Sequence, residues 1–344
     1  MKKNSWLIFL LIFLSACTNK KVKKDFFEHE GFSAGTSFMI EYDKNAGNLN
    51  NEIDKIFAEI ERSVLFTDST SLLNRINRND SVRDPDQHFF KLLDLSKRIH
   101  QETKGAFDPT IFPLTEFWGV DENKFKNQQK IDSSFIDSLK RAVGLDMIFT
   151  RINYGPSVIK HNRHLILNFD NIYQGYTADM IVELFNSYNV SNYRIEIGGK
   201  IRAKGLNTKG KKWQLGIDEP TENPKTRKLF AIATLDNEGY AIAGSYRKYY
   251  TKNEMKLPFT IDPLTGYPVL HTLIAVSVFA PTCAEAEAYA TAFMVMGVEK
   301  TKVFLNTHTQ LQVYMISTNY KGEWLSFISN GLKEKLEFVK EDPI

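Results

Sequence analysis

Helix-like and strand-like hydrophobic patterns alternate along this chain, and no Gly- or Pro-rich linker separates them. The spacing of apolar residues predicts helices through 53–60, 84–105, 132–144, 176–188 and 284–296. Strand-like runs occur over 164–169, 193–197, 213–217, 229–235, 273–279 and 311–316. This mixture predicts an α+β fold, and the roughly 320 residues after the N-terminal segment can bury the core of one large domain or two intimate lobes.

The first 17 residues have the three parts of a secretory signal. A positively charged start precedes an apolar run over 6–14, which is too short to span a membrane, and small residues then lead into Cys17. Residues 14–17 resemble a lipobox, so we expect a signal peptide over 1–17, a lipid on Cys17 and a flexible tether over 18–29. The expected location is the periplasmic face of a bacterial inner membrane, or else the outer membrane. The alternative is an ordinary signal peptide or a short membrane segment, with an accidental cysteine.

The charge balance gives no sign of a nucleic-acid partner. The chain has 44 basic and 41 acidic residues and a net charge of +3, and cleavage of the signal removes two of the lysines. Cys283 is the second of two cysteines, so lipidation of Cys17 leaves it without an intramolecular disulfide partner. Its apolar neighbours predict that Cys283 packs as a small hydrophobic residue.

Polar groups combine with turn-forming residues in five segments: 105–110, 168–179, 196–200, 261–268 and 285–291. Each segment alone also has a purely structural explanation, and residues 262–266, for example, make a good turn. Glu287 and Thr291 differ because their i, i+4 spacing places both oxygens on one helix face, where they can share a hard cation such as Mg²⁺. The surrounding alanines predict burial, and a buried carboxylate needs a partner. The sequence has no zinc-ligand spacing, Walker A loop or dinucleotide-binding glycine motif.

Taken in order, these segments resemble the ApbE family of FAD:protein FMN transferases. The resemblance implies one ApbE-like α+β domain over 30–340, with mixed or antiparallel sheets flanked by helices. The implied activity is Mg²⁺-dependent transfer of FMN from FAD to a Ser or Thr hydroxyl of an exported or membrane-bound flavoprotein, with release of AMP. The segments that carry the resemblance are 35–36, 71–77, 103–110, 117–119, 168–179, 196–205, 216–220, 243–247, 261–268 and 286–297.

The same resemblance implies roles for individual residues. The implied Mg²⁺ ligands are Glu287, Thr291 and the backbone carbonyl near Asn171. Arg247 is expected either near a phosphate or in a surface ion pair. The implied FAD contacts are Ala34, Phe66, Ala106, Phe107, Asp108, Asn168, Gln174 and Ile261.

This sequence departs from the usual family pattern at five motif positions. Asn168 and Glu287 each stand where the family usually has Asp, and Gln174 replaces a frequent Lys or Glu. Ala243 stands where the family usually has Ser, and Phe259 where it usually has His. If the family's His activates the attacking hydroxyl, general-base help of about 10²- to 10⁴-fold is missing unless Asp262 supplies it. A role in its turn also explains Asp262. The favoured prediction is an active transferase, and the alternatives are a catalytically weak FAD-binding lipoprotein and an FAD pyrophosphate hydrolase that releases FMN and AMP.

Overall fold

The structure is a computed structural model that describes residues 25–33, 35–120, 133–151, 155–219, 228–244, 249–252 and 255–339. Its helices are α1 (Asn50–Val64), α2 (Leu72–Arg78), α3 (Gln87–Glu102), α4 (Phe112–Trp118), α5 (Ser133–Lys140), α6 (Tyr173–Ser187), α7 (Cys283–Leu305) and α8 (Asn330–Lys333), with 3₁₀ turns η1 (Lys44–Ala46) and η2 (Leu145–Met147). Its strands are β1 (Phe26–Ser33), β2 (Thr36–Asp43), β3 (Ser81–Arg83), β4 (Ile148–Arg151), β5 (Ser157–Lys160), β6 (Tyr193–Ile197), β7 (Lys200–Lys204), β8 (Trp213–Asp218), β9 (Leu229–Leu235), β10 (Glu238–Gly244), β11 (Tyr250–Lys252), β12 (Met255–Leu257), β13 (Leu273–Ala280), β14 (Gln312–Thr318), β15 (Trp324–Ile328) and β16 (Leu336–Phe338).

The largest sheet has eight strands in the order β1-β2-β6-β7-β10-β13-β14-β15. Every pair of named strands in the described residues is antiparallel. β13 lies inside this sheet and is buried along its whole length, which explains its nearly continuous apolar sequence. β6 instead alternates buried and partly exposed residues, as expected of a strand with one face packed on the core.

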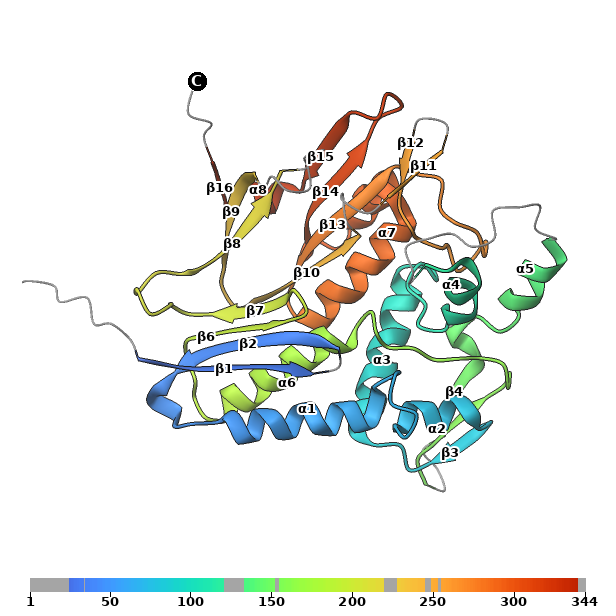
Figure 1. Cartoon of the computed structure of the whole chain (residues 1–344), viewed down its shortest axis with the longest axis horizontal. Helices are drawn as coiled ribbons and strands as arrows, with labels where there is room; N and C mark the ends of the chain where they lie inside the picture. The colour runs from blue at the N-terminus through green and yellow to red at the C-terminus, as the bar shows by residue number, and fades with distance from the viewer. Residues whose placement is uncertain are drawn as a thin grey trace, which may run out of the picture.

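Helices cover one face of the large sheet and a small three-stranded sheet covers the other (Figure 1). α1 and α6 pack on β2 and β6 through a core that includes Ile40, Ile53 and Ile195. α7 packs across β10 and β13 and also contacts α6. On the opposite face β8 and β9 pack against the sheet through residues such as Trp213 and Phe279. The central strands are therefore covered on both sides.

The N-terminal end of α7 is held by close packing and by a capping side chain. A Cβ atom on Gly175 of α6 would lie 2.4 Å from the carbonyl oxygen of Cys283, and one on Gly239 of β10 would lie 2.4 Å from the Cys283 nitrogen. Asp179 of α6 accepts the backbone N–H groups of Cys283 and Ala284 at 3.0 and 2.9 Å. A carboxylate at this position satisfies donors that the helix itself leaves unpaired. α6, β10 and the start of α7 are therefore closely packed, and this packing fixes the first turns of α7 relative to the other two elements.

The predicted α+β class, with antiparallel sheets and flanking helices, is confirmed. The strands predicted over 193–197 and 229–235 match β6 and β9, and the helix through 53–60 is α1. Two helices are longer than predicted, since α6 begins at Tyr173 and α7 continues to Leu305 past a non-helical Gly297. Cys283 is fully buried, as its apolar neighbours predicted.

The strand predicted over 164–169 is wrong, because this segment belongs to none of the sheets. Its backbone groups bond to irregular partners instead of to a neighbouring strand. The Leu167 N–H donates to Asn77 Oδ1 at 2.8 Å, and the Asn168 N–H donates to the Pro109 carbonyl at 2.8 Å. An apolar segment can therefore be buried in an extended conformation without joining a β-sheet. Here segment 164–169 brings Asn168 beside residues 103–110.

The helix predicted to open at Asp84 is also misplaced at its start, since α3 begins at Gln87. Asp86 is the capping residue, and its Oδ1 accepts the N–H of Phe89 at 2.9 Å. Asp84 has a φ of +52° and directly follows β3, the strand that precedes the helix. Two aspartates flank the same proline, and only the three-dimensional path of the chain decides which one caps the helix.

Candidate active site

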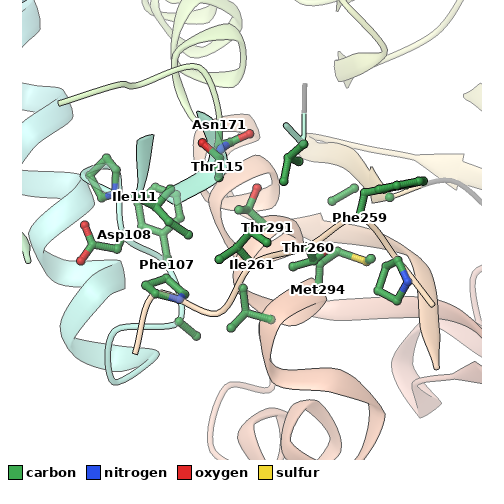
Figure 2. Close-up of a pocket in the computed structure, with 18 of the residues that line it drawn as sticks. Phe107, Asp108, Ile111, Thr115, Asn171, Phe259, Thr260, Ile261, Thr291 and Met294 are labelled. Carbon is green, nitrogen blue, oxygen red and sulfur yellow. The ribbon is translucent and has the colours of Figure 1, made fainter. Parts of the chain in front are cut away.

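A cavity of about 670 Å³ lies between α4, α7, the segment that leads into α6 and the connection from β12 to β13 (Figure 2). One part of its lining is polar and includes Asn168, Asp170, Asn171 and Thr291. The rest is mainly apolar and includes Ile111, Phe112, Phe259, Ile261, Ile274, Met294 and Val295. A mixed lining of this kind suits an organic ligand that has both an apolar body and polar groups.

Seven of the predicted site residues line this one cavity, although they come from four distant parts of the sequence. They are Ala106, Phe107, Asp108, Asn168, Asn171, Ile261 and Thr291. Figure 2 shows that they enter from the loop before α4, the segment before α6, the loop after β12 and the middle of α7. Motif order along the chain had suggested a common site, and the fold brings these residues together. Their contacts with a ligand stay a prediction.

Asp108 gives the loop at 103–110 its shape. Its side chain is buried, and Oδ1 accepts both the backbone N–H and the hydroxyl of Thr110 at 2.8 and 2.6 Å. His100 Nδ1 lies 3.6 Å from the other carboxylate oxygen and 2.9 Å from the Phe107 carbonyl oxygen. Burial raises the pKa of the Asp108 carboxyl, and its hydrogen bonds with Thr110 and the nearby imidazole oppose that rise. We conclude that Asp108 organises the loop from within, so that Ala106 and Phe107 face the cavity.

The polar side of the cavity begins at Asn168. Its Nδ2 group donates to Asp170 Oδ2 at 3.0 Å, and its Oδ1 accepts the Asp170 N–H at 2.8 Å. These bonds form a tight turn that passes through Asn171 into the first turn of α6. The turn brings amide, carboxylate and backbone groups to the cavity close to the place where Thr291 enters from α7 (Figure 2).

Glu287 lies one helical turn before Thr291 on α7 and is only 4% exposed. Its Oε2 accepts the backbone N–H of Gly175 at 2.8 Å, and its Oε1 lies 3.2 Å from Lys200 Nζ. Burial raises the pKa of the Glu287 carboxyl, whereas the nearby lysine and the Gly175 N–H lower it. The Thr291 hydroxyl donates to the Glu287 carbonyl at 3.3 Å. The predicted burial of this helix face is confirmed, and so is the expectation that the carboxylate has partners.

The residues around Glu287 fit a hard divalent cation in their chemistry. A carboxylate, a hydroxyl and a backbone carbonyl are oxygen donors of the kind that Mg²⁺ prefers. The buried carboxylate also needs positive charge nearby. In the described part of the chain no three His, Cys, Asp or Glu side chains are grouped for a metal. The oxygen donors predicted for a cation here are the carboxylate of Glu287, the hydroxyl of Thr291 and the backbone carbonyl near Asn171, and the carboxylate of Asp170 lines the same cavity.

Four predicted residues in the described part lie outside the cavity lining. Phe66 is one layer behind it and packs on Phe112, with ring centroids 4.7 Å apart. Gln174 and Glu287 lie at the crossing of α6 and α7, where Gln174 Oε1 accepts a hydrogen bond from Lys200 at 2.9 Å. Asp262 lines a separate cavity of about 1010 Å³. Ala34, Arg247 and the lipidation residue Cys17 lie outside the described residues.

Asp262 shapes the turn that separates the two cavities. Its Oδ1 accepts the N–H of Leu264 at 2.9 Å, and its backbone exchanges hydrogen bonds with Tyr267 and Gly266. Ile261 and Pro263 on either side of it line the smaller cavity. The turn role expected for this residue is present. Asp262 itself lines the larger cavity, and only its two neighbours in the sequence line the candidate site.

Two of the family departures belong to the lining of the cavity. Ala243 and Phe259 both line the cavity, next to Gly244 and Thr260. Phe259 packs against Tyr250, with ring centroids 5.5 Å apart. A phenyl ring has no group that accepts or donates a proton, so Phe259 itself offers no acid–base chemistry.

Two residues that the sequence interpretation left without a role are important for the geometry. Lys200 follows the Gly198-Gly199 pair and provides the cation beside Glu287. Asp179 caps α7, as described above. Both lie inside the motif segments, and the need of a buried carboxylate for a cation could have pointed to Lys200. The capping contact joins residues more than 100 positions apart, and no local pattern indicates it.

Comparison with known proteins identifies the family of this chain. A family model described as the ApbE family matches residues 34–315. A Haemophilus influenzae protein named FAD:protein FMN transferase is 30% identical over 321 residues, covering 90% of this chain and 91% of that protein. An Escherichia coli K12 protein of the same name is 34% identical over 228 residues, covering 66% of this chain and 64% of that protein.

Solved structures share the fold. The flavin transferase ApbE from Vibrio cholerae has a TM-score of 0.78 at 24% identity, covering 92% of this chain and all of that one. The Pseudomonas stutzeri flavinyl transferase ApbE in its apo form has a TM-score of 0.77 at 23% identity, covering 91% and 97%. The fold is therefore that of the solved flavin transferases. The family model spans most of the sequence, so the chain belongs to the ApbE family and is classed among its transferase enzymes.

Proposed function

We propose that this protein transfers FMN from FAD to a Ser or Thr hydroxyl of an acceptor flavoprotein and releases AMP. One observation carries the proposal: residues 106–108, 168, 171, 261 and 291, which carry the family motifs, line a single cavity. That cavity ends at the helix turn that holds a buried carboxylate. The curated relatives named FAD:protein FMN transferase support the same activity.

The cavity suits FAD in its division of polar and apolar surface. The apolar part, which includes Ile261 and Met294, can pack against a flat aromatic ring system. The amides of Asn168 and Asn171 each provide both donors and an acceptor for ring edges or phosphate oxygens. Glu287 and Thr291, with the backbone carbonyl near Asn171, would hold Mg²⁺, which neutralises the negative charge on a pyrophosphate as it is split.

The reaction needs one bond to form and one to break. The acceptor hydroxyl oxygen attacks the phosphorus on the FMN side of the pyrophosphate, and the bond between that phosphorus and the bridging oxygen breaks. The bridging oxygen and its electron pair leave with AMP, and the hydroxyl proton passes to a base. Among the residues near the cavity we propose Asp262 for that base, because its neighbours Ile261 and Pro263 line the site and Phe259 cannot accept a proton.

Phe259 also favours a second candidate function. A cavity wall without a base at this position activates a protein hydroxyl poorly, so the protein could hold FAD with little transfer, or let water split it into FMN and AMP. These outcomes differ in their products. Transfer gives a flavin-labelled acceptor and AMP, hydrolysis gives free FMN and AMP, and binding alone gives no product.

The test mixes the chain lacking residues 1–17 with FAD, Mg²⁺ and an exported flavoprotein acceptor. Flavin fluorescence is read on the acceptor band of a denaturing gel, and AMP is measured in the same tube. We expect a fluorescent band that needs Mg²⁺ and is lost in Glu287→Ala. Glu299→Ala is the matched control, because Glu299 is an exposed carboxylate on the same helix. AMP without a labelled acceptor would favour hydrolysis, and FAD binding without AMP would favour a binding protein.

We also propose that Cys17 carries a lipid that anchors the protein on the periplasmic face of the inner membrane, where it meets exported acceptors. The support is the order of charged, apolar and small residues before Cys17. No helix in the described residues has the length and hydropathy needed to cross a membrane. The test is incorporation of labelled palmitate by the whole chain in cells, with Cys17→Ala expected to abolish it. Separation of the two membranes would distinguish an inner from an outer anchor.

A further inference from the structure

Lys200 forms an ion pair with the carboxylate that the proposed function assigns to Mg²⁺. Its Nζ atom lies 3.2 Å from Glu287 Oε1 and donates a hydrogen bond to Gln174 Oε1 at 2.9 Å. The Gly198 carbonyl oxygen is a third neighbour at 3.5 Å. The ammonium group thus has acceptors from α6, α7 and the turn between β6 and β7.

The fold holds this lysine in place. Lys200 starts β7, directly after a turn in which Gly198 and Gly199 have φ values of +55° and +80°. A Cβ atom on Gly198 would lie 2.5 Å from Gln174 Oε1, so the missing side chain leaves room for that amide to meet the lysine. The Lys200 side chain is 19% exposed, so its aliphatic part can extend toward the surface and carry the ammonium group into solvent.

Both oxygens of Glu287 already have partners. Gly175 N–H occupies Oε2 at 2.8 Å and Lys200 occupies Oε1. Asp170 adds a second negative charge close enough to raise the pKa of Glu287. A buried carboxylate with an acidic neighbour requires positive charge, and the ammonium group provides it. A divalent cation near Oε1 would meet the same need, and the two cations would repel each other across a short distance.

We propose that Lys200 is a built-in counter-ion that competes with the divalent metal for Glu287 and so sets the metal affinity of this site. The proposal rests on the proposed function, in which Glu287 is a metal ligand. Without metal, Lys200 neutralises the carboxylate and keeps the crossing of α6 and α7 intact. Metal binding displaces the ammonium group from Oε1. Because the lysine repels the metal ion, it lowers the affinity of the site for the metal.

The first experiment titrates Mg²⁺ into the chain lacking residues 1–17, without FAD or acceptor, by calorimetry, and repeats the titration with Mn²⁺ by electron paramagnetic resonance. Lys200→Met keeps the length of the side chain and removes its charge. We expect it to bind both ions about tenfold more tightly, because the metal is then no longer repelled by a cation in a poorly solvated site. Lys200→Arg keeps the charge and should stay within about threefold of the wild type.

Two control variants define the site. Glu287→Gln should lose the metal affinity in both the wild-type and the Lys200→Met background. Lys212→Met removes the lysine of an exposed ion pair with Asp236, 2.6 Å long, and should leave the affinity unchanged. A change of affinity in Lys212→Met equal to that in Lys200→Met would reduce the effect to general electrostatics and overturn the proposal.

Thermal unfolding gives a readout that does not depend on activity. In EDTA, Lys200→Met should melt below the wild type, because the buried carboxylate then lacks its cation. Saturating Mg²⁺ should raise the melting temperature of Lys200→Met more than that of the wild type, because the stabilisation by a ligand, RT ln(1 + [L]/Kd), increases as Kd falls. An equal Mg²⁺-dependent rise in both proteins would overturn the proposal.

The outcomes separate this inference from the function on which it rests. Equal metal affinity in the wild type and Lys200→Met, with loss in Glu287→Gln, overturns the role of Lys200 and leaves Glu287 as a ligand. Unchanged affinity in Glu287→Gln removes Glu287 from the metal site and overturns both the role of Lys200 and the assignment of Glu287 as a metal ligand. Tighter binding in Lys200→Met that depends on Glu287 supports both assignments.

Discussion

The apolar wall of the cavity and the polar cluster next to the cavity are built differently. The polar cluster, called the carboxylate side below, consists of Gln174, Gly175, Lys200 and Glu287; it lies outside the cavity lining, and each of these residues has a named partner within hydrogen-bond or ion-pair distance. The apolar wall, formed by Ala243, Phe259, Ile261 and Ile274, contributes surface and shape to the cavity. The carboxylate side lies where α6 and α7 pack closely against each other.

The departures from the family pattern follow the same division. On the carboxylate side, Glu287 keeps the acid group of the usual Asp, and Gln174 keeps a polar side chain. On the apolar wall, Ala243 and Phe259 replace groups that can donate or accept protons. Under the proposed function, the carboxylate assigned to the charge of the pyrophosphate is kept, and the residues at the positions assigned to proton transfer are changed. The predictions below test that difference, from the largest expected effect to the smallest.

Removal of the Glu287 carboxylate should have the largest effect. We expect Glu287→Ala to lower FMN transfer by about 10³-fold, because the proposed reaction depends on charge stabilisation at this point. Glu287→Asp restores the usual family residue and should retain most activity. The measurement is the initial rate of acceptor labelling at saturating FAD. Activity near the wild-type level in Glu287→Ala would show that the carboxylate side is not needed for transfer.

The attachment of the carboxylate side depends on Asp179. Asp179→Ala deprives two N–H groups of α7 of their acceptor and takes the carboxylate away from Arg202 Nε, 3.6 Å distant. We expect a loss of about 3 kcal/mol in the free energy of unfolding, because a buried charge loses its partner. Asp179→Asn keeps one acceptor oxygen and should lose less. Urea denaturation measures both, and an effect below about 0.5 kcal/mol, the usual range for surface substitutions, would contradict this account of the cap.

Asp179 should also make stability depend on pH. Burial raises its pKa from 3.8 to about 6, with the helix N–H groups and Arg202 opposing the rise. A folded-state pKa above the unfolded value means that its stabilising contribution is present below pH 3.8 and is lost as the pH rises through about 6. Relative to Asp179→Asn, the wild type should lose up to about 3 kcal/mol of stability over this interval. Parallel curves for the two proteins in urea denaturation at pH 4 to 7 would contradict it.

The apolar wall should respond to a restored base. We expect Phe259→His to raise transfer about tenfold, which is less than a fully positioned base provides because the surrounding wall is shaped for a phenyl ring. The rate should rise with pH through the titration of the new imidazole, near pH 6.5. Phe259→Leu is the control for a change of packing alone. A rate equal to the wild type in Phe259→His would show that proton removal does not limit transfer, and Asp262→Asn would then be the next variant to measure.

Local patterns predicted much of the fold and some of the site. The i, i+4 spacing of Glu287 and Thr291 placed both on one buried helix face, because the helical period is a property of the backbone. The runs at 193–197 and 229–235 were found as strands for a similar reason. The run at 164–169 was misread, because Asn77 and Pro109 supply its hydrogen-bond partners from far along the chain.

The sequence by itself determined the α+β class, the buried helix face with its carboxylate and the resemblance that pointed to a flavin transferase. These depend on periodicity, turn chemistry and motif order, all of which are readable along one chain. Only the tertiary structure decided which cation meets Glu287, which aspartate caps α7 and which residues share the cavity. Those contacts join segments such as α6, β7 and α7 across 26 to 112 positions, and they arise from packing between elements, which one-dimensional spacing does not encode.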